Sequence, residues 1–407
     1  MTTTNPEPSA LSAPPTAQIS PVAWAKRNLF SDWSNTILTV VCLGAIAWLA
    51  YGLLNWIFTQ AQWQVISANL RLFFVGRYPA QLMWRPWTVL GIIALSAGLT
   101  WGILARSTWL FNQTGLVVLG VIAAICVALA VPVSLNTSLL LLAILGVSVA
   151  AAFAGQRIGQ RFPTLVSWLP LIWLGIFFVV FGLIRGGLFL QEVRLDDLSG
   201  LLLTLLTAIV SIVLSFPLGV LLALGRQSNL PVVRWMSIGF IEIIRGLPLI
   251  TILFMSSLLV PLVLPPNVRI DRVVRAIAGL TLFSAAYLAE NVRGGLQSIP
   301  RGQSEAAKAL GLSAPLVTVL IILPQALKAV IPTIVGQFIS LFKDTSLLAI
   351  VGFAELLGIS QSILSNPNFL GRYQEVYAFD TVIYFCCCYA MALASRRLER
   401  QLGTGQR

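Results

Sequence analysis

The side chains of this sequence that could do chemistry are charged residues set inside long apolar stretches. Lys343, Asp344, Thr345 and Ser346 interrupt one such stretch and together supply an ammonium group, a carboxylate and two hydroxyl groups. Charged residues at membrane depth are unfavourable and usually face a helix bundle or water. Two roles stay open for them: Lys343 and Asp344 neutralise each other near the end of a span, or all four residues line a cavity through which a zwitterion passes.

Little else in the sequence could support catalysis or bind a cofactor. There is no histidine, which removes histidine general bases and histidine metal ligands, and no GxxxxGK[ST] phosphate-binding loop, so any ATP binds to another chain. The five cysteines lie in apolar runs without metal-ligand spacing and are interpreted as small packing residues: Cys42, Cys126, Cys386, Cys387 and Cys388. We therefore predict that the chain is not an enzyme and carries no cofactor or metal.

Two pairs of opposite charge stand at the ends of apolar runs. Glu242 and Arg245 are three residues apart, so on a helix they can pair with each other or cap the start of a span. We favour a structural ion pair there over contact with a substrate. Glu290 and Arg293 have the same spacing and are expected to mark the inner end of another span, where interfacial anchoring is favoured over gating.

The composition requires that these residues be positioned by membrane helices. The chain has 407 residues, of which 57% are hydrophobic and 10% charged, and its mean hydropathy is +0.89, which leaves too few polar groups to cover a soluble globule. Helices satisfy their own backbone groups in lipid, and each needs about 20 apolar residues to span. An all-α polytopic membrane protein is predicted.

Ten transmembrane spans are predicted, in two groups separated by an acidic link with Glu192, Asp196 and Asp197. The first five belong to an N-terminal extension at 36–190, and the next five to a core at 198–400. The expected spans are 36–58, 87–105, 114–132, 136–153 and 166–184, then 200–224, 246–264, 273–290, 330–351 and 376–394. Residues 1–35 are expected to be a disordered cytoplasmic tail, and 59–86 an interfacial, partly helical outer loop.

The charge distribution predicts the orientation of the chain. Lys26 and Arg27 precede the first span and predict a cytoplasmic N-terminus, and ten spans return the C-terminus to the same side. Arg269, Arg272 and Arg275 fall in a predicted outer loop and oppose this assignment. The formal net charge of +12 is dispersed over loops, so it indicates membrane topology and not a nucleic-acid partner.

A polar loop at 291–328 lies between two apolar runs and must therefore be in water. Pro300 prevents any earlier helix from continuing, and the residues after it are good helix formers. Gly311 suits a left-handed C-cap, and Ser313 is a natural N-cap for a second helix with Pro315 in its first turn. The sequence thus predicts a helix, a sharp turn and a second helix.

This loop resembles the EAA loop of ABC-importer permeases. The family pattern is E-A-A, three residues, G, nine residues, then I-x-L-P, and every fixed position is matched: Glu305, Ala306, Ala307, Gly311, Ile321, Leu323 and Pro324. The resemblance implies a coupling helix that docks into a cleft of a separate ATPase subunit and transmits its closure to the membrane spans.

Other motifs resemble the polar amino-acid branch of these permeases. They are the Gly200 start of the first core span, the EIIRGLPLI string with Gly246 and Pro248, and the AAYLAENVRGGLQSIP string that leads into the loop. A string from Asn69 to Trp87 also resembles the long permease subunits of general L-amino-acid importers.

The resemblance implies a transmembrane subunit of a type I ABC importer of L-amino acids in the bacterial inner membrane. Its implied partners are two ATPase subunits that hold ATP and Mg, a second permease subunit in a heterodimer or homodimer, and an extracytoplasmic amino-acid-binding protein. The alternative is an ion-coupled secondary amino-acid transporter, in which Lys343 and Asp344 would be the coupling groups. That class predicts inverted repeats with broken helices, and no related halves are evident.

Overall fold

The computed structural model describes residues 20–105, 110, 113–129, 134–187, 189–265 and 267–402, and these residues are helical apart from connecting loops and two isolated β-bridges. They confirm the predicted all-α membrane fold. By internal contacts the chain divides after Gln62 into two compact units, which are described separately below.

The first unit contains a short helix and one long apolar helix. Helix α1 (Pro21–Asn28) begins at Ser20, whose hydroxyl accepts a hydrogen bond from the amide of Ala23 at 3.2 Å. Helix α2 (Trp33–Asn55) continues into a π-helical turn, η1 (Trp56–Gln60), and forms the first candidate span. Residues 1–19 of the predicted tail lie outside the described residues, whereas 20–35 hold α1 and the start of α2, which corrects the expectation of disorder there.

The second unit begins with helices from the predicted extension: α3 (Gln64–Val75), α4 (Trp84–Leu104), α5 (Gln113–Ala128), α6 (Leu135–Arg161) and α7 (Leu165–Arg185). Helices α4 and α6 pack closely because glycines remove side chains from their contact. A Cβ atom on Gly102 would lie 2.0 Å from the carbonyl oxygen of Ala152, and one on Gly155 would lie 2.3 Å from that of Leu99. This is the small-residue packing by which membrane helices associate.

The predicted core follows in the same unit, as a series of helical segments. They include α8 (Gly200–Arg226), α9 (Pro231–Gly246), α10 (Leu249–Phe254), η4 (Met255–Leu259), α11 (Val260–Val263), α12 (Arg272–Ser298), α13 (Arg301–Ala309), α14 (Ala314–Leu316), η5 (Val317–Ile322), α15 (Leu323–Asp344), α16 (Leu356–Leu364) and α17 (Tyr373–Leu402). A 3-10 segment, η6 (Thr345–Ala349), extends α15. Helix α12 lies at the centre of this half and contacts α8, α9, α10 and α15.

The number of spans in the described residues is smaller than the predicted ten. Eight helices have the length and composition to cross a membrane, or nine if one bent pair counts as a span. The expected span at 114–132 corresponds to α5, a 16-residue helix, and the end of that prediction lies outside the described residues.

The expected span at 246–264 corresponds to a shorter continuous helical stretch, Leu249–Val263, and a bend separates this stretch from helix α9. Helix α9 ends at Gly246, Pro248 precedes α10, and the two helical parts meet at 106°. Pro248 has no amide hydrogen to continue the ladder, and its ring disfavours helical geometry in the preceding residue. Pro248 therefore stands directly before the start of α10, as expected for a proline near a helix start, and together with Gly246 it also marks a bend.

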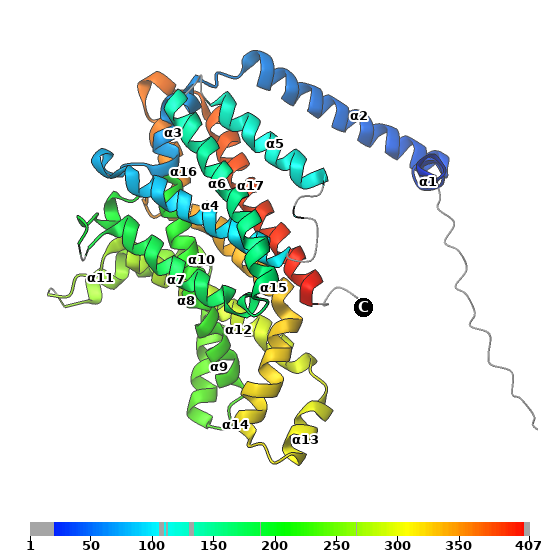
Figure 1. The fold of residues 1–407 in the computed structure, drawn as a ribbon, viewed down its shortest axis with the longest axis vertical. Coiled ribbons are helices and arrows are strands. Elements are labelled where there is room, and N and C mark those ends of the chain that lie inside the picture. The colour runs from blue at the N-terminus through cyan, green and yellow to red at the C-terminus, as the bar shows by residue number, and fades with distance from the viewer. Residues whose placement is uncertain are drawn as a thin grey trace, which may run out of the picture. The chain divides into compact units, whose positions relative to one another are not determined.

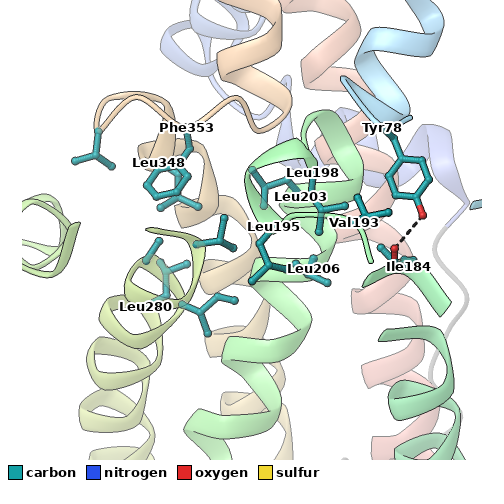
Figure 2. Close-up of a cluster of buried hydrophobic side chains, with 14 of the residues drawn as sticks. Tyr78, Ile184, Val193, Leu195, Leu198, Leu203, Leu206, Leu280, Leu348 and Phe353 are labelled. Atoms are coloured by element: carbon teal, nitrogen blue, oxygen red, sulfur yellow. Dashed lines mark hydrogen bonds between the residues drawn. The ribbon is translucent and has the colours of Figure 1, made fainter. Parts of the chain in front are cut away.

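The predicted loop at 59–86 is partly buried against the rest of the protein, while Trp63, Phe74 and Trp84 remain exposed. Its helical part is α3, but Val65, Phe73, Tyr78 and Arg85 are all almost inaccessible. The Tyr78 hydroxyl donates to the carbonyl oxygen of Ile184 at 2.9 Å and joins a cluster of leucines from α8, α12 and η6 (Figure 2). Burial raises the pKa of the Tyr78 phenol, and the neighbouring Arg85 partly offsets this effect.

Two arginines that opposed the predicted orientation are held by backbone oxygens. The Arg272 guanidinium donates to the carbonyl of Val351 and lies 4.3 Å from the ring centre of Phe353. Arg275 donates to the carbonyl of Ser257 in the π-helical turn η4. These contacts give both residues a structural role in the fold.

Candidate functional site

An exposed elbow joins α12 to α15 and contains the EAA residues. It lies at the end of the second unit opposite to α3 and α16, with α13 and α14 at its tip (Figure 1). Gly311 has φ +80° and its amide donates to the carbonyl of Lys308 at 2.9 Å, while the amide of Leu312 donates to Ala307 at 3.2 Å. This is the glycine C-cap expected from sequence. Ser313 stands at the N-cap, although its side chain makes no capping hydrogen bond.

Most residues of helix α13 in the elbow are exposed. Glu305 and Ala306 are exposed, and only Ala307 is buried, where α13 packs against η5. Leu310, the residue before the turn, is 83% exposed. Leu316, Val319 and Leu320 in the second helix of the elbow are exposed as well, so the elbow carries several uncovered apolar side chains.

Leu323 and Pro324 begin α15, immediately after the π-helical segment η5. Leu323 packs against the buried cluster that contains Val292, Leu296 and Ala326, whereas Pro324 is exposed in the first turn of the helix. The expected span at 330–351 is part of one continuous helical segment, Ala314–Ala349. The second helix of the elbow, which begins at Ala314, and the membrane span therefore belong to the same helical segment.

Three arginines surround Glu290 at the junction of α8, α9 and α12. Arg293 donates to Glu290 from Nε at 3.0 Å, and Arg226 and Arg245 each have a nitrogen 3.6 Å from its other carboxylate oxygen. Glu242 pairs with Arg226 at 3.0 Å, so the expected Glu242–Arg245 pair is not formed. The pairing differs because α8 supplies Arg226, which the local spacing of Glu242 and Arg245 did not indicate.

The Lys343 segment lines a pocket of about 470 Å³ at the end of α15. Lys343 and Ser346 contribute to the wall of this pocket. Thr345, which lies between them in the sequence, is buried, and Asp344 is not among the lining residues. No ion pair joins Lys343 to Asp344 among the described residues. The opposite wall comes from α17 and includes Asp380, Thr381 and Tyr384.

Behind this pocket lies a buried carboxylate that sequence reasoning missed. Glu355 is fully buried, accepts hydrogen bonds from the amides of Leu357 and Gly358 at 3.0 and 2.9 Å, and is 3.3 Å from the hydroxyls of Thr204 and Tyr384. Burial raises the pKa of Glu355 to about 7, against the effect of the two amides. In the sequence, Glu355 and Asp380 each stand as a single acidic residue in an apolar stretch, and this pattern could have indicated buried carboxylates.

Comparisons with known proteins identify the family. The family model for the binding-protein-dependent transport system inner membrane component matches residues 215–403. The chain is 38% identical to the glutamate/glutamine/aspartate/asparagine transport system permease protein BztC of Rhodobacter capsulatus, over 95% of each chain. It is 37% identical to the inner membrane amino-acid ABC transporter permease protein YhdY of Escherichia coli K12, over 95% of this chain and 94% of the other.

A shorter relative covers only part of the chain. The probable glutamine ABC transporter permease protein GlnP of Bacillus subtilis is 37% identical over 49% of this chain and 91% of its own length.

The chain therefore belongs to the permease subunits of binding-protein-dependent ABC transporters for polar amino acids. This confirms the predicted recognition, with the permease core in the C-terminal half. It is a multi-pass inner-membrane protein that works with an ATPase and a binding protein, and ATP hydrolysis belongs to the partner. No cofactor is expected on this chain.

Proposed function

We propose that this permease forms one side of the translocation pathway in an importer with two ATPase subunits and a second, non-identical permease subunit. A periplasmic binding protein delivers a polar L-amino acid to it, and closure of the ATPases drives the change of access. The relatives named for glutamate, glutamine, aspartate and asparagine transport support this substrate class.

The exposed elbow carries the coupling half of the proposal. Glu305, Ala306, Ala307 and Gly311 form a short helix with a glycine stop, and Leu310 is exposed beside it. In this proposal α13 enters an ATPase cleft, Leu310 fills an apolar part of that cleft, and Leu323 and Pro324 transmit the movement into α15.

The Lys343 face carries the pathway half of the proposal. Lys343 is exposed, and the helical rod to which it belongs is long and apolar enough to span the membrane. An uncovered ammonium group is strongly unfavourable against lipid, so this face is expected to meet water or the second permease subunit. Lys343, Ser346 and the α17 wall of the pocket then line the route, with Asp344 and Thr345 supporting it from behind.

The arginine cluster and the bend have structural roles in this proposal. Together with Arg226 at the end of α8, the residues Glu242, Arg245, Glu290 and Arg293 hold α8 and α9 to α12, and Gly246 with Pro248 sets the change of direction. We propose that both termini are cytoplasmic and that 36–190 is an extension added to the 198–400 core. GlnP supports the division, because about half of this chain is enough to match nearly all of it.

The test is transport by the reconstituted assembly. We expect uptake of a labelled polar amino acid that requires ATP and the binding protein and persists when a protonophore collapses the proton gradient. Uptake that is independent of ATP but abolished by the protonophore would establish the ion-coupled alternative.

The coupling half is tested by Leu310→Glu. This change should reduce co-purification of the ATPase and lower uptake to about a tenth or less, because it places a charge in an apolar contact. Leu310→Met is the matched control and should retain both. Full coupling in the glutamate variant would refute the role of the elbow.

A further inference from the structure

The pocket beside Lys343 contains an acidic side chain without a hydrogen-bonding partner. Asp380 on α17 is 4% exposed, and neither of its carboxylate oxygens has a hydrogen bond among the described residues. The Ser360 hydroxyl interacts with it, but donates to the carbonyl of Leu356 at 2.9 Å. A buried carboxylate is strongly unfavourable when nothing compensates its charge, so its position in a pocket wall indicates a site for a positive group.

The other acidic groups nearby are not available for this purpose. Glu355 already receives two backbone amides and lies beside the hydroxyls of Thr204 and Tyr384. Asp344 follows Lys343 directly but is not part of the wall. The sequence indicated a pair of opposite charges at 343 and 344, whereas in the structure the acidic residue that lines the same pocket as Lys343 is Asp380 from a different helix.

The formal charge of the pocket wall is zero. Lys343 contributes one positive charge and Asp380 one negative charge, and the remaining polar lining consists of hydroxyl-bearing side chains such as Ser346, Thr381 and Tyr384. A volume of about 470 Å³ leaves room for a single amino acid and water. The charges suit a molecule with one ammonium and one carboxylate group.

We propose that Asp380 binds the α-ammonium group and Lys343 the α-carboxylate of an amino acid in transit, so that this permease favours net-neutral amino acids over acidic ones. The inference rests on the proposed transport function and names the specificity of its pathway. A second carboxylate on the substrate, as in glutamate, lacks a positive partner in this wall.

The experiment measures equilibrium binding to the purified permease–ATPase complex without the binding protein. Its probes are L-glutamine, L-glutamate and glutaramic acid, which is glutamine without the α-amino group. Wild-type complex should bind glutamine about tenfold or more tightly than glutaramic acid, the difference expected for a charge-assisted hydrogen bond. It should also prefer glutamine to glutamate. Equal binding of glutamine and glutaramic acid would overturn the inference without any variant.

The variants separate the two contacts. Asp380→Asn should weaken glutamine binding and bring the glutamine-to-glutaramic acid ratio close to one, whereas Lys343→Met should weaken both ligands equally. Cys386→Ala changes an exposed residue of α17 outside the pocket wall and should behave as wild type. If Asp380→Asn fails to assemble, Asp380→Glu keeps the charge and should retain a preference for glutamine.

The outcomes distinguish this inference from the proposed function. A wild-type ratio in Asp380→Asn, with ATP-driven uptake intact, would reject the role of Asp380 and leave the transporter assignment standing. Absence of ATP-driven uptake in the wild-type assembly would instead reject the proposed function.

Discussion

The two ends of the second unit differ in how their backbone turns are surrounded. At the end formed by α3 and α16, Gly200 has φ +64°, and a Cβ atom there would lie 2.6 Å from the carbonyl oxygen of Phe73 and 2.7 Å from that of Leu72. At the elbow, Gly311 has φ +80°, yet a Cβ atom there would meet nothing within 4 Å. Both positions favour glycine, but only the first is enclosed by its own chain.

This difference agrees with the proposal that the first end is a scaffold and that the elbow contacts a partner. Around Gly200 the segments are connected by the amide of Gly200 to Ala354 at 2.8 Å, by the amide of Arg77 to Ser199 at 2.6 Å and by the contact of the Phe73 and Phe379 rings. Around Gly311 the surface is exposed. Residues of the predicted extension thus pack against the core at the end that contains Gly200. The end that contains Gly311 is formed by core residues alone.

The largest effect is expected at the enclosed glycine. Gly200→Val should prevent assembly, because the left-handed conformation is unfavourable by about 1–2 kcal/mol for a side chain and overpacking adds about 1–3 kcal/mol. Size-exclusion chromatography and thermal unfolding in detergent would measure this loss. A variant that assembles with an unchanged melting temperature would contradict the scaffold role.

At the open glycine, stability and function should separate. The Cβ atom added by Gly311→Val meets nothing within 4 Å, so the expected loss of stability is mainly the backbone strain of about 1–2 kcal/mol, while uptake should fall several-fold because the side chain obstructs the ATPase contact. Melting temperature and uptake are measured on the same preparation. Equal proportional losses in both would show that the elbow is structural.

Glu290→Gln tests the cluster that lies between these two ends. It leaves three arginines without their shared carboxylate, and because the Glu290 side chain is 24% exposed, we expect a moderate loss of about 1–2 kcal/mol. Glu242→Gln is the matched control, since its side chain is 54% exposed and should matter less. Thermal unfolding of both variants checks the order.

The smallest predicted effect is a pH dependence from Glu355. Its pKa is raised to about 7 from 4.5, so the folded protein binds more protons than the unfolded chain between these values. Stability from this group is fully present below pH 4.5 and is lost as pH rises through 7. Glu355→Gln should therefore flatten the melting temperature between pH 5 and 8, and an unchanged slope would assign the dependence to other groups.

The elbow shows what local sequence can predict. Pro300, Gly311 and Pro315 each act within one turn of the chain, so the stop, the reversal and the restart could be predicted from residue types alone. The apolar runs likewise gave most of the spans.

The features that were predicted wrongly depend on contacts between segments that are far apart in the sequence. Arg226 replaces Arg245 as the partner of Glu242, and Asp380, not Asp344, lines the pocket with Lys343, because helix packing decides which side chains lie together. The burial of Tyr78 and Arg85 depends on carbonyl groups about 106 residues further along the chain. Local periodicity holds no information on such pairs.

The unbroken rod from Ala314 to Ala349 has a mechanical consequence. Its 36 residues give a length of about 54 Å at 1.5 Å per residue. If it pivots as a lever about its far end, a tilt of about 6° shifts the near end by about 5 Å. Wider helical turns at η5 interrupt the regular hydrogen-bond ladder near the elbow, and this short stretch is where the stiffness of the connection between the elbow and α15 can be adjusted by single substitutions.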